Sequence, residues 1–227
     1  MADTIAARVL AFNNALEIKE QLPEGVSVIN PFSNPETLRV SGSFYEKFYS
    51  DNTPRVAIFG INPGRFGAGV TGVPFTDPAK LEIDCGIPNS FDKKAEASSN
   101  FVYEVVHAWG GPQAFYQRFF IGGVCPLGFI KESKNNNFYD SPALRDDVLP
   151  IIIDKVWEQI ALGLDREVCY ILGKGQNFAF FEKLNKTHGF FDRLVALPHP
   201  RWVMQYRFKR RHEFADEFVQ VLAPDSQ

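Results

Sequence analysis

The chain alternates short apolar runs with longer segments whose apolar positions recur at helical spacing. The apolar runs have the length and composition of buried strands and cover residues 55–60, 119–124, 168–172 and 194–197. The helical spacing appears in residues 3–20, 98–109, 146–162 and 206–222, and in the segment that follows residue 175. Strands that alternate with helices predict an α/β fold. We expect a single domain over residues 1–227, with a central four-stranded parallel sheet flanked by helices.

Two loops stand out because each directly follows a predicted strand. Residues 61–75 follow the first strand, and residues 198–206 follow the last. The connection between residues 61 and 97 is long for a compact domain, which is typical of a functional loop. In parallel α/β sheets the ligand lies beyond the carboxyl ends of the strands. The pattern therefore predicts that the two loops meet and form a site there.

Composition narrows the class of protein. The 227 residues are 45% hydrophobic and include 22 phenylalanines, which indicates a core rich in aromatic rings. No apolar run approaches the roughly eighteen residues that a membrane span needs, and the N-terminus lacks the features of a secretory signal. The three cysteines are too widely spaced for a disulfide framework or for metal ligands. We therefore expect a cytoplasmic protein whose chemistry uses neither a metal nor a cofactor.

The distribution of charged residues indicates a polyanionic partner at one segment of the chain only. The net charge is −3, but residues 201–212 read R-W-V-M-Q-Y-R-F-K-R-R-H and contain no acidic residue. A local basic patch can bind phosphates on a mildly acidic molecule, although a solvated helix face is the alternative interpretation. The candidate phosphate contacts are Arg201, Arg207, Lys209, Arg210 and Arg211.

The loop at residues 60–75 carries the most specific motif, G-I-N-P-G-R-F-G-A-G-V-T-G-V-P-F. Its glycines allow backbone amides to approach a ligand closely, but it contains neither pattern of a phosphate-binding loop. From spacing alone, a glycine-rich turn without chemistry is equally compatible. The segment resembles, without gaps, the first motif of the single-strand-selective monofunctional uracil-DNA glycosylases, G-M-N-P-G-P-F-G-M-x-Q-T-G-V-P-F.

The resemblance continues in the same order to the C-terminus. A-E-A-S-S at 95–99 is similar to the family's S-E-V-S-G, V-C-P-L at 124–127 to H-C-P-L, S-P-A-L at 141–144 to T-P-A-D-L, and H-P-R at 199–201 to H-P-S-P-R. Two departures stand out. Gly123 replaces an asparagine that reads the pyrimidine edge in the family, and the second motif is one Ser-Pro shorter. The chain thus resembles the divergent bacterial second subfamily.

The resemblance implies hydrolysis of the N-glycosidic bond of uracil in DNA, as in base excision repair, without strand cleavage. Asn62 would place the attacking water, and His199 would donate a hydrogen bond to the departing pyrimidine O2. Phe75 would stack on the extruded base. Ile61, Gly64 and Ala68 would contact it through their backbone, and Gly123 would leave room that we expect to admit xanthine or hypoxanthine. A glycine-flanked turn and ordinary core packing are the alternative roles for Asn62 and Phe75.

DNA is the expected partner, bound by a monomer at the bacterial nucleoid. Trp202, Met204 or Tyr206 would fill the gap that the extruded nucleotide leaves. Residues 135–137 and Glu96 are weaker candidates, for a base contact and for orienting the first loop. Two other functions remain open. One is a catalytically silent DNA-binding relative, and the other is an α/β enzyme that acts on free nucleosides or nucleotides.

Overall fold

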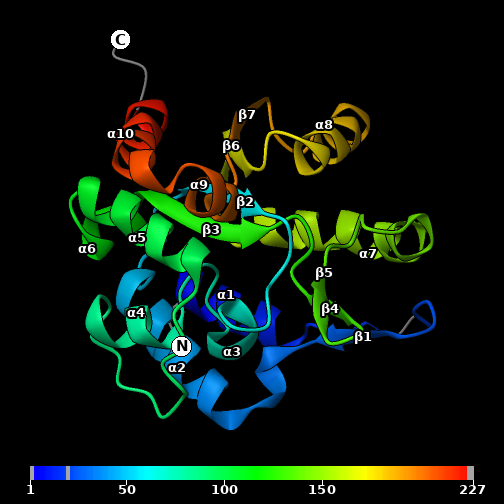
Figure 1. Ribbon diagram of the computed structural model, residues 1–227, viewed down its shortest axis with the longest axis horizontal. Coiled ribbons are helices and arrows are strands. Elements are labelled where there is room, and N and C mark those ends of the chain that lie inside the picture. The colour runs from blue at the N-terminus through cyan, green and yellow to red at the C-terminus, as the bar shows by residue number, and fades with distance from the viewer. Residues whose placement is uncertain (1–2, 19–20, 224–227) are drawn as a thin grey trace.

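A four-stranded parallel sheet with strand order β3-β2-β6-β7 lies at the centre of the molecule (Figure 1). The computed structural model describes residues 3–18 and 21–223. The strands are β2 (Arg55–Gly60), β3 (Phe119–Gly123), β6 (Leu164–Leu172) and β7 (Arg193–Leu197). Every pair in this sheet is parallel, so the predicted sheet is confirmed.

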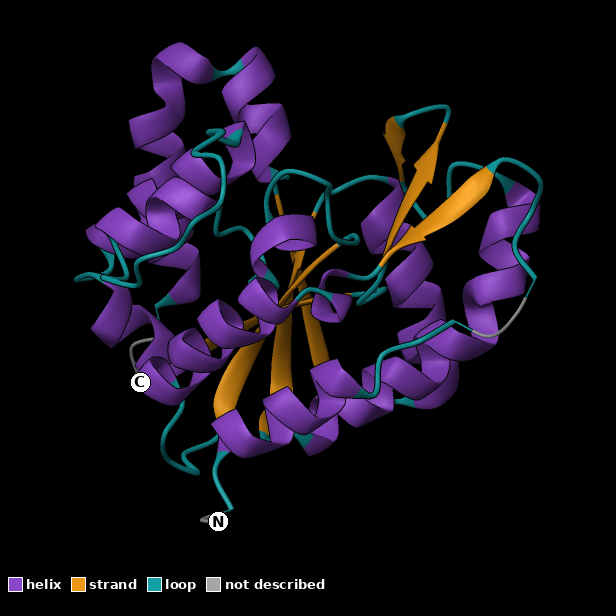
Figure 2. Ribbon diagram, turned by 90° about the horizontal axis from the view of Figure 1, so that it is seen from below, coloured by secondary structure: helices purple, strands orange, loops and turns teal. Residues whose placement is uncertain are grey.

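The composition of strand β2 explains why the central sheet could be predicted from the sequence. All six of its residues are buried, as expected for a strand with structure on both faces. Ala57 pairs with Phe120 of β3 and with Cys169 of β6, which places β2 between these two neighbours. Figure 2 shows helices packed around the strands on both sides of the sheet.

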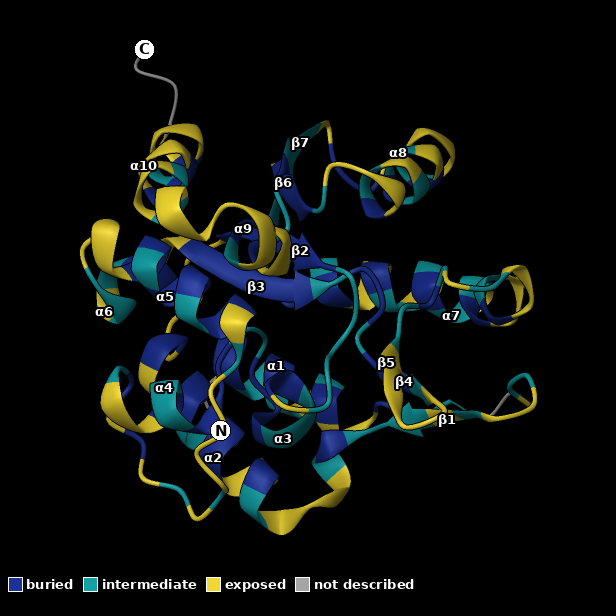
Figure 3. Cartoon of the chain, in the orientation of Figure 1, coloured by how far each residue is buried: buried dark blue, intermediate teal, exposed yellow. Residues whose placement is uncertain are grey.

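Several of the longer helices bury one face and expose the other, which Figure 3 shows for α10. Their bounds are α1 (Ile5–Asn14), α2 (Pro35–Phe48), α3 (Ala68–Thr71), α4 (Pro78–Ile83), α5 (Ala97–Ala108), α6 (Pro112–Arg118), α7 (Pro142–Ala161), α8 (Gln176–His188), α9 (Pro200–Tyr206) and α10 (Arg211–Leu222). In the part of the chain that the structure describes, none of these helices is long and apolar enough to cross a bilayer.

Several helix boundaries differ from the prediction. The predicted helix 206–222 is observed as a 3-10 turn at Phe208–Arg210 followed by α10, and most of the predicted loop 198–206 is helix α9. Helix α7 starts earlier than expected because Ser141 caps it, accepting a hydrogen bond from the Leu144 N–H at 3.2 Å, and Pro150 lies inside it. The helix expected over 3–20 ends at Asn14, and residues 19–20 lie outside the described chain.

Helix α5 begins at Ala97, one residue before the start of the predicted helix 98–109. Neither Ser98 nor Ser99 caps this helix, because its N-cap position is Glu96, whose side chain makes no capping bond. Instead the Glu96 N–H donates to the Asp77 carboxylate at 2.9 Å. Both serines are buried; the Ser99 hydroxyl accepts a hydrogen bond from the Asp77 N–H at 3.1 Å, and Ser98 lines a cavity.

A second, antiparallel sheet of order β1-β4-β5 was not predicted. It consists of β1 (Val26–Ile29), β4 (Gly128–Lys131) and β5 (Lys134–Asn136). Strands β4 and β5 are joined by Glu132 and Ser133, which have φ angles of 48° and 59°. A two-residue turn with both central residues at positive φ is typical of tight hairpins. The sequence K-N-N of β5 is too short and polar to indicate a strand.

Candidate active site

A cavity of about 330 Å³ lies where the two predicted loops meet, at the carboxyl ends of the parallel strands. Asn62 and His199 both line it, as do all the residues that were predicted to contact the base and three of those predicted to contact DNA. These further residues are Ile61, Gly64, Ala68, Phe75, Gly123, Arg201, Trp202 and Tyr206. Segments far apart in the sequence therefore form one binding site.

The strand ends beneath the cavity are tied together by Asn177 at the start of α8. Its buried carboxamide donates to the Leu172 carbonyl at 3.1 Å and lies 3.4 Å from the Gly60 carbonyl, at the ends of β6 and β2. The Gly173 N–H donates to the Leu197 carbonyl at 2.8 Å, which joins the end of β6 to that of β7. These bonds fix the relative positions of the loops that carry Asn62 and His199.

His199 is held as a neutral hydrogen-bond donor. It is the N-cap of α9, and its Nδ1 accepts a hydrogen bond from the Arg201 N–H at 3.1 Å. Burial, together with the nearby positive charge of Arg201, lowers the pKa of His199 to about 4. A neutral ring whose Nδ1 is an acceptor carries its proton on Nε2. Because Pro200 occupies the first position of α9, the ring is fixed with respect to the cavity.

Phe75 is placed by an unusual backbone and by a glycine beneath it. Its φ angle is 52°, in the left-handed region that a bulky residue rarely adopts. Its ring centroid lies 6.0 Å from that of His199. A Cβ on Gly60 would lie only 2.9 Å from the Phe75 ring, so the ring rests directly on the end of β2. Phe75 thus presents a fixed aromatic face to the cavity.

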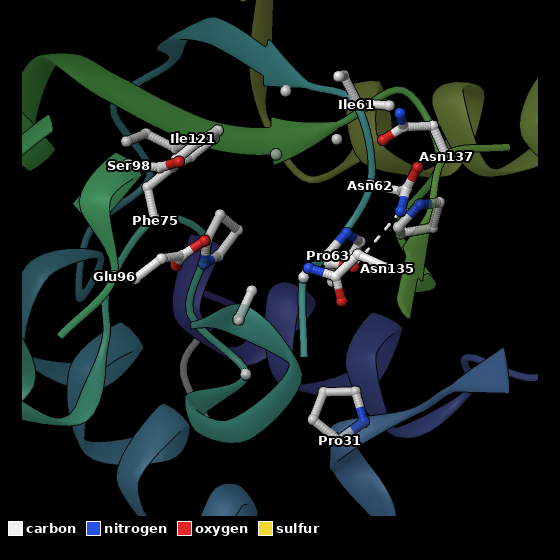
Figure 4. Close-up of a pocket in the computed structure, with 18 of the residues that line it drawn as sticks. Pro31, Ile61, Asn62, Pro63, Phe75, Glu96, Ser98, Ile121, Asn135 and Asn137 are labelled. Atoms are coloured by element: carbon white, nitrogen blue, oxygen red, sulfur yellow. Dashed lines mark hydrogen bonds between the residues drawn. The ribbon is translucent and has the colours of Figure 1, made fainter. Parts of the chain in front are cut away.

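Asn62 is oriented by the β4–β5 hairpin and the residues that follow it. Its Oδ1 accepts a hydrogen bond from the Phe138 N–H at 3.2 Å, and its Nδ2 donates to the Asn136 carbonyl at 3.3 Å. These two partners define which end of the carboxamide is oxygen. Nδ2 also lies 3.4 Å from the Pro63 carbonyl, so the group that remains free to hold a water molecule is one lone pair of Oδ1. Figure 4 shows Asn62 on the same wall of the cavity as Asn135 and Asn137.

The facing wall carries Phe75, Glu96 and Ser98 (Figure 4). Burial and the nearby Asp77 carboxylate together raise the pKa of Glu96 to about 7, although the positive charge of Arg201 opposes the shift. The Glu96 carboxylate lies directly over Gly67, where a Cβ would overlap it. The Ser98 side chain lines the cavity although the residue is only 4% exposed, and its hydroxyl has no hydrogen-bond partner among the described residues. Both side chains are therefore available to a ligand.

Gly123 of β3 stands where the family has an asparagine, and a side chain from helix α7 occupies the space beside it. Gln159 of α7 is buried, lines the cavity, and donates from Nε2 to the Gly123 carbonyl at 3.0 Å. Its Oε1 lies 3.4 Å from the Gly123 nitrogen, and a Cβ on Gly122 would lie 2.4 Å from this Oε1. The room that was expected beside Gly123 is thus partly occupied by Gln159. This role could not be predicted from the sequence, because a glutamine in an amphipathic helix usually faces solvent.

The basic segment after His199 offers fewer free charges than its sequence implied. Arg210 pairs with Glu213 at 2.7 Å and Arg211 with Glu104 at 2.8 Å, whereas the Arg207 guanidinium lies 4.9 Å from the centre of the Trp202 ring. Trp202 and Tyr206 are exposed at the cavity, whereas Met204 packs against the hydrophobic core. Of the three candidate wedge residues, the two aromatic ones are therefore accessible to DNA.

The chemical groups of the cavity suit hydrolysis without a covalent amine intermediate. No lysine is among the described residues that line it, and a strand-cutting glycosylase needs an amine nucleophile. The wall instead presents an imidazole, a guanidinium, several carboxamides, three hydroxyl-bearing side chains and one carboxyl group. Nowhere in residues 3–18 and 21–223 do three His, Cys, Asp or Glu side chains come together as a group that could hold a metal ion.

Comparisons with known proteins agree with this geometry. The family model described as the uracil DNA glycosylase superfamily matches residues 46–223. The chain is also similar to the crystal structure of wild-type SMUG2 from Pedobacter heparinus, with 42% sequence identity and a TM-score of 0.93. That alignment covers 96% of each chain. No curated protein matches the chain in sequence.

Proposed function

The chain belongs to the uracil DNA glycosylase superfamily, and from that premise we propose that it excises uracil from DNA in the cavity between Asn62 and His199. As a member of the superfamily it is a DNA glycosylase. The observation that carries the proposal is that a neutral imidazole donor, an oriented carboxamide and a fixed aromatic face line the same cavity. We propose further that it leaves the DNA strand uncut and acts as a monomer, since residues of one chain line the site.

His199 stabilises the leaving group in this mechanism. When the bond between C1′ of the sugar and N1 of uracil breaks, both bonding electrons leave with the base and negative charge develops on its oxygens. The Nε2–H of His199 donates a hydrogen bond to O2 of the departing base. A positioned donor of this kind contributes about 10²–10³ in rate, or roughly 3–4 kcal/mol. The neutral imidazole can make this bond because its Nδ1 accepts from the Arg201 N–H, which leaves the proton on Nε2.

Asn62 directs a water molecule to the sugar. The free lone pair of Oδ1 accepts a hydrogen bond from this water, whose oxygen then forms the new bond to C1′. A carboxamide is a poor base, so the water loses its proton to solvent only after the C1′–N1 bond has largely broken. Such a loose transition state carries positive charge on the sugar and depends little on a strong nucleophile.

Base selection depends on groups around the rest of the cavity. Phe75 stacks on the extruded base, and backbone groups of Ile61, Gly64 and Ala68 contact its edge. We extend the proposal to the deaminated purines xanthine and hypoxanthine. Gly64 and Gly123 line the cavity without a side chain of their own, and Glu96 offers an additional polar contact. Arg201, Trp202 and Tyr206 lie at the same cavity, where they bind the DNA backbone and fill the gap in the base stack.

A base-release assay tests the proposal and separates it from its alternatives. Labelled single- and double-stranded oligonucleotides that contain uracil, xanthine, hypoxanthine or thymine are incubated with the protein and then treated with alkali. We expect strand breaks at uracil only after alkali, and no covalent adduct on trapping with borohydride. Binding without breaks would identify a silent DNA-binding relative, and neither binding nor breaks would favour an enzyme of free nucleosides. Release of uracil but of neither purine would overturn the wider specificity alone.

A further inference from the structure

A second basic and aromatic surface lies beside the cavity, away from the segment that the sequence singled out. Phe66 is 42% exposed, and two cations lie on its ring. The Arg65 guanidinium is 4.5 Å from the ring centroid and the Lys94 ammonium 5.7 Å. An exposed aromatic ring between two cations offers a stacking surface for a base and positive charge for the adjoining phosphates.

The β4–β5 hairpin adds two more cations to this surface. Lys131 and Lys134 are exposed and lie directly opposite each other across the two strands. Like charges directly opposite each other on two strands destabilise the hairpin, so hairpin stability does not explain why both positions carry a lysine. The Arg65 guanidinium donates to the Ser133 carbonyl in the hairpin turn, and the Arg65 N–H donates to the Asn135 side chain at 3.1 Å. The hairpin and the Phe66 loop therefore form one continuous surface.

These cations are not neutralised as Arg210 and Arg211 are in the segment 201–212. Within the described chain, none of Arg65, Lys94, Lys131 and Lys134 forms an ion pair, whereas Arg210 and Arg211 each have a carboxylate partner. The turn residue Glu132 is the one acidic side chain between the two hairpin lysines. The surface thus retains a net positive charge even though the whole protein is acidic.

Each segment of the surface also supplies a residue to the cavity wall. Gly64 immediately precedes Arg65, Asn135 immediately follows Lys134, and Glu96 lies two residues after Lys94. Consecutive Cα atoms are about 3.8 Å apart, so these cations begin within one or two residues of the site. A DNA strand whose nucleotide enters the cavity would have to pass close to this rim.

We propose that Arg65, Phe66, Lys94, Lys131 and Lys134 form a binding surface for the single-stranded DNA that adjoins the extruded nucleotide, with an unpaired base stacked on Phe66. This inference rests on the proposed function, because it takes the cavity to be the place where the nucleotide enters. The four cations hold the phosphates of the strand. The surface is independent of base sequence, since any base has a face that can stack on an aromatic ring.

Binding of a fluorescently labelled single-stranded oligonucleotide without uracil, followed by anisotropy over a range of salt concentrations, tests the inference. Phe66→Ala should weaken binding about tenfold, and Phe66→Trp should retain it. The double variant Lys131→Gln/Lys134→Gln should reduce the slope of log affinity against log salt by about 1.4, because each phosphate contact to a single strand contributes about 0.7.

Two matched controls lie outside the cavity wall. Trp157 is 38% exposed and has the Arg166 guanidinium 5.3 Å from its ring, so Trp157→Ala removes a comparable aromatic–cation pair. Lys183→Gln/Lys186→Gln on α8 removes the same charge as the hairpin variant. Both controls should bind like the unaltered protein, and thermal unfolding checks that every variant is folded.

The binding readout separates this inference from the proposed function. If the Phe66→Ala and hairpin variants bind like the unaltered protein while uracil is still released, only the DNA surface is refuted. If the unaltered protein releases no uracil, the proposed function fails, and the binding comparison still decides whether this surface holds a single strand. An equal loss of affinity in the controls would show that the effect is not specific to this surface, and would overturn the inference.

Discussion

Replacing Glu96 with glutamine should stabilise the folded protein at alkaline pH and extend its activity to higher pH. Glu96 is the only carboxyl group among the described residues that line the cavity. Its pKa is raised to about 7 by burial and by Asp77, with Arg201 as the opposing charge. Above neutral pH the folded protein therefore holds a carboxylate that the surroundings disfavour. Glutamine keeps the shape of the side chain and removes that charge.

The size of the stability gain follows from the difference between the pKa of Glu96 in the folded and in the unfolded protein. A pKa of about 7 in place of the usual 4.5 spans about 2.5 pH units, and each pH unit corresponds to about 1.4 kcal/mol. The upper limit is therefore about 3 kcal/mol. Water in the open cavity screens part of the charge, so we expect a gain of about 1–3 kcal/mol.

The sign of the effect defines the pH window. Because the pKa is higher in the folded protein, the folded state keeps its proton over a range in which the unfolded state has lost it. The stability of the unaltered protein that depends on Glu96 is thus intact below about pH 4.5 and is lost as the pH rises through about 7. Urea unfolding should show Glu96→Gln to be nearly neutral at pH 5 and stabilising at pH 8. A stability difference that is the same at both pH values would refute this account.

Activity provides a second readout for the same variant. An ionised Glu96 repels the base as it departs as an anion, so uracil release by the unaltered protein should decline above about pH 7. Glu96→Gln should retain its rate there, whereas Glu182→Gln, a partly exposed residue on α8, should follow the unaltered protein. An unchanged alkaline decline in Glu96→Gln would show that another group causes it.

Other substitutions test the individual contacts of the site. His199→Ala should reduce the rate of base release about 10²–10³-fold without unfolding the protein, and the pKa of about 4 predicts no loss of His199-dependent activity between pH 7 and pH 5, checked by single-turnover rates across that range. Gly60→Ala should displace the Phe75 ring and raise KM in steady-state assays, because its Cβ would lie 2.9 Å from that ring. Gln159→Leu should destabilise the fold by about 1–3 kcal/mol in urea unfolding, since it leaves the Gly123 peptide without its partner.

The sheet and the location of the site could be predicted because their signals are local. Strand β2 is a continuous apolar run that ends at a glycine-rich loop, and β7 ends at the loop that carries His199. Placing both loops at the carboxyl edge then follows from parallel pairing. Parallel pairing also predicts that Asn62 and His199 lie at one site, and both residues line the same cavity.

The parts that escaped prediction depend on contacts between distant segments. The lysines and asparagines of the β4–β5 hairpin indicate a solvated loop in the sequence, yet the hairpin orients Asn62 through the carbonyl of Asn136. Gln159 lies in a helix that was predicted, but its role arises only because Gly122 leaves space for it. Conversely, the compact basic run after His199 looked stronger than it is, because Glu213 and Glu104 neutralise two of its arginines.

Direct detection of free uracil after a single turnover tests the central claim most directly. A uracil-containing oligonucleotide is incubated with excess protein, and the released base is quantified by chromatography against the number of alkali-sensitive sites. We predict one uracil per abasic site for the unaltered protein, and at least about 100-fold slower release for Asn62→Ala and for His199→Ala. Uracil release at an undiminished rate by both variants would place the chemistry elsewhere, and the absence of release by the folded, unaltered protein would contradict the account.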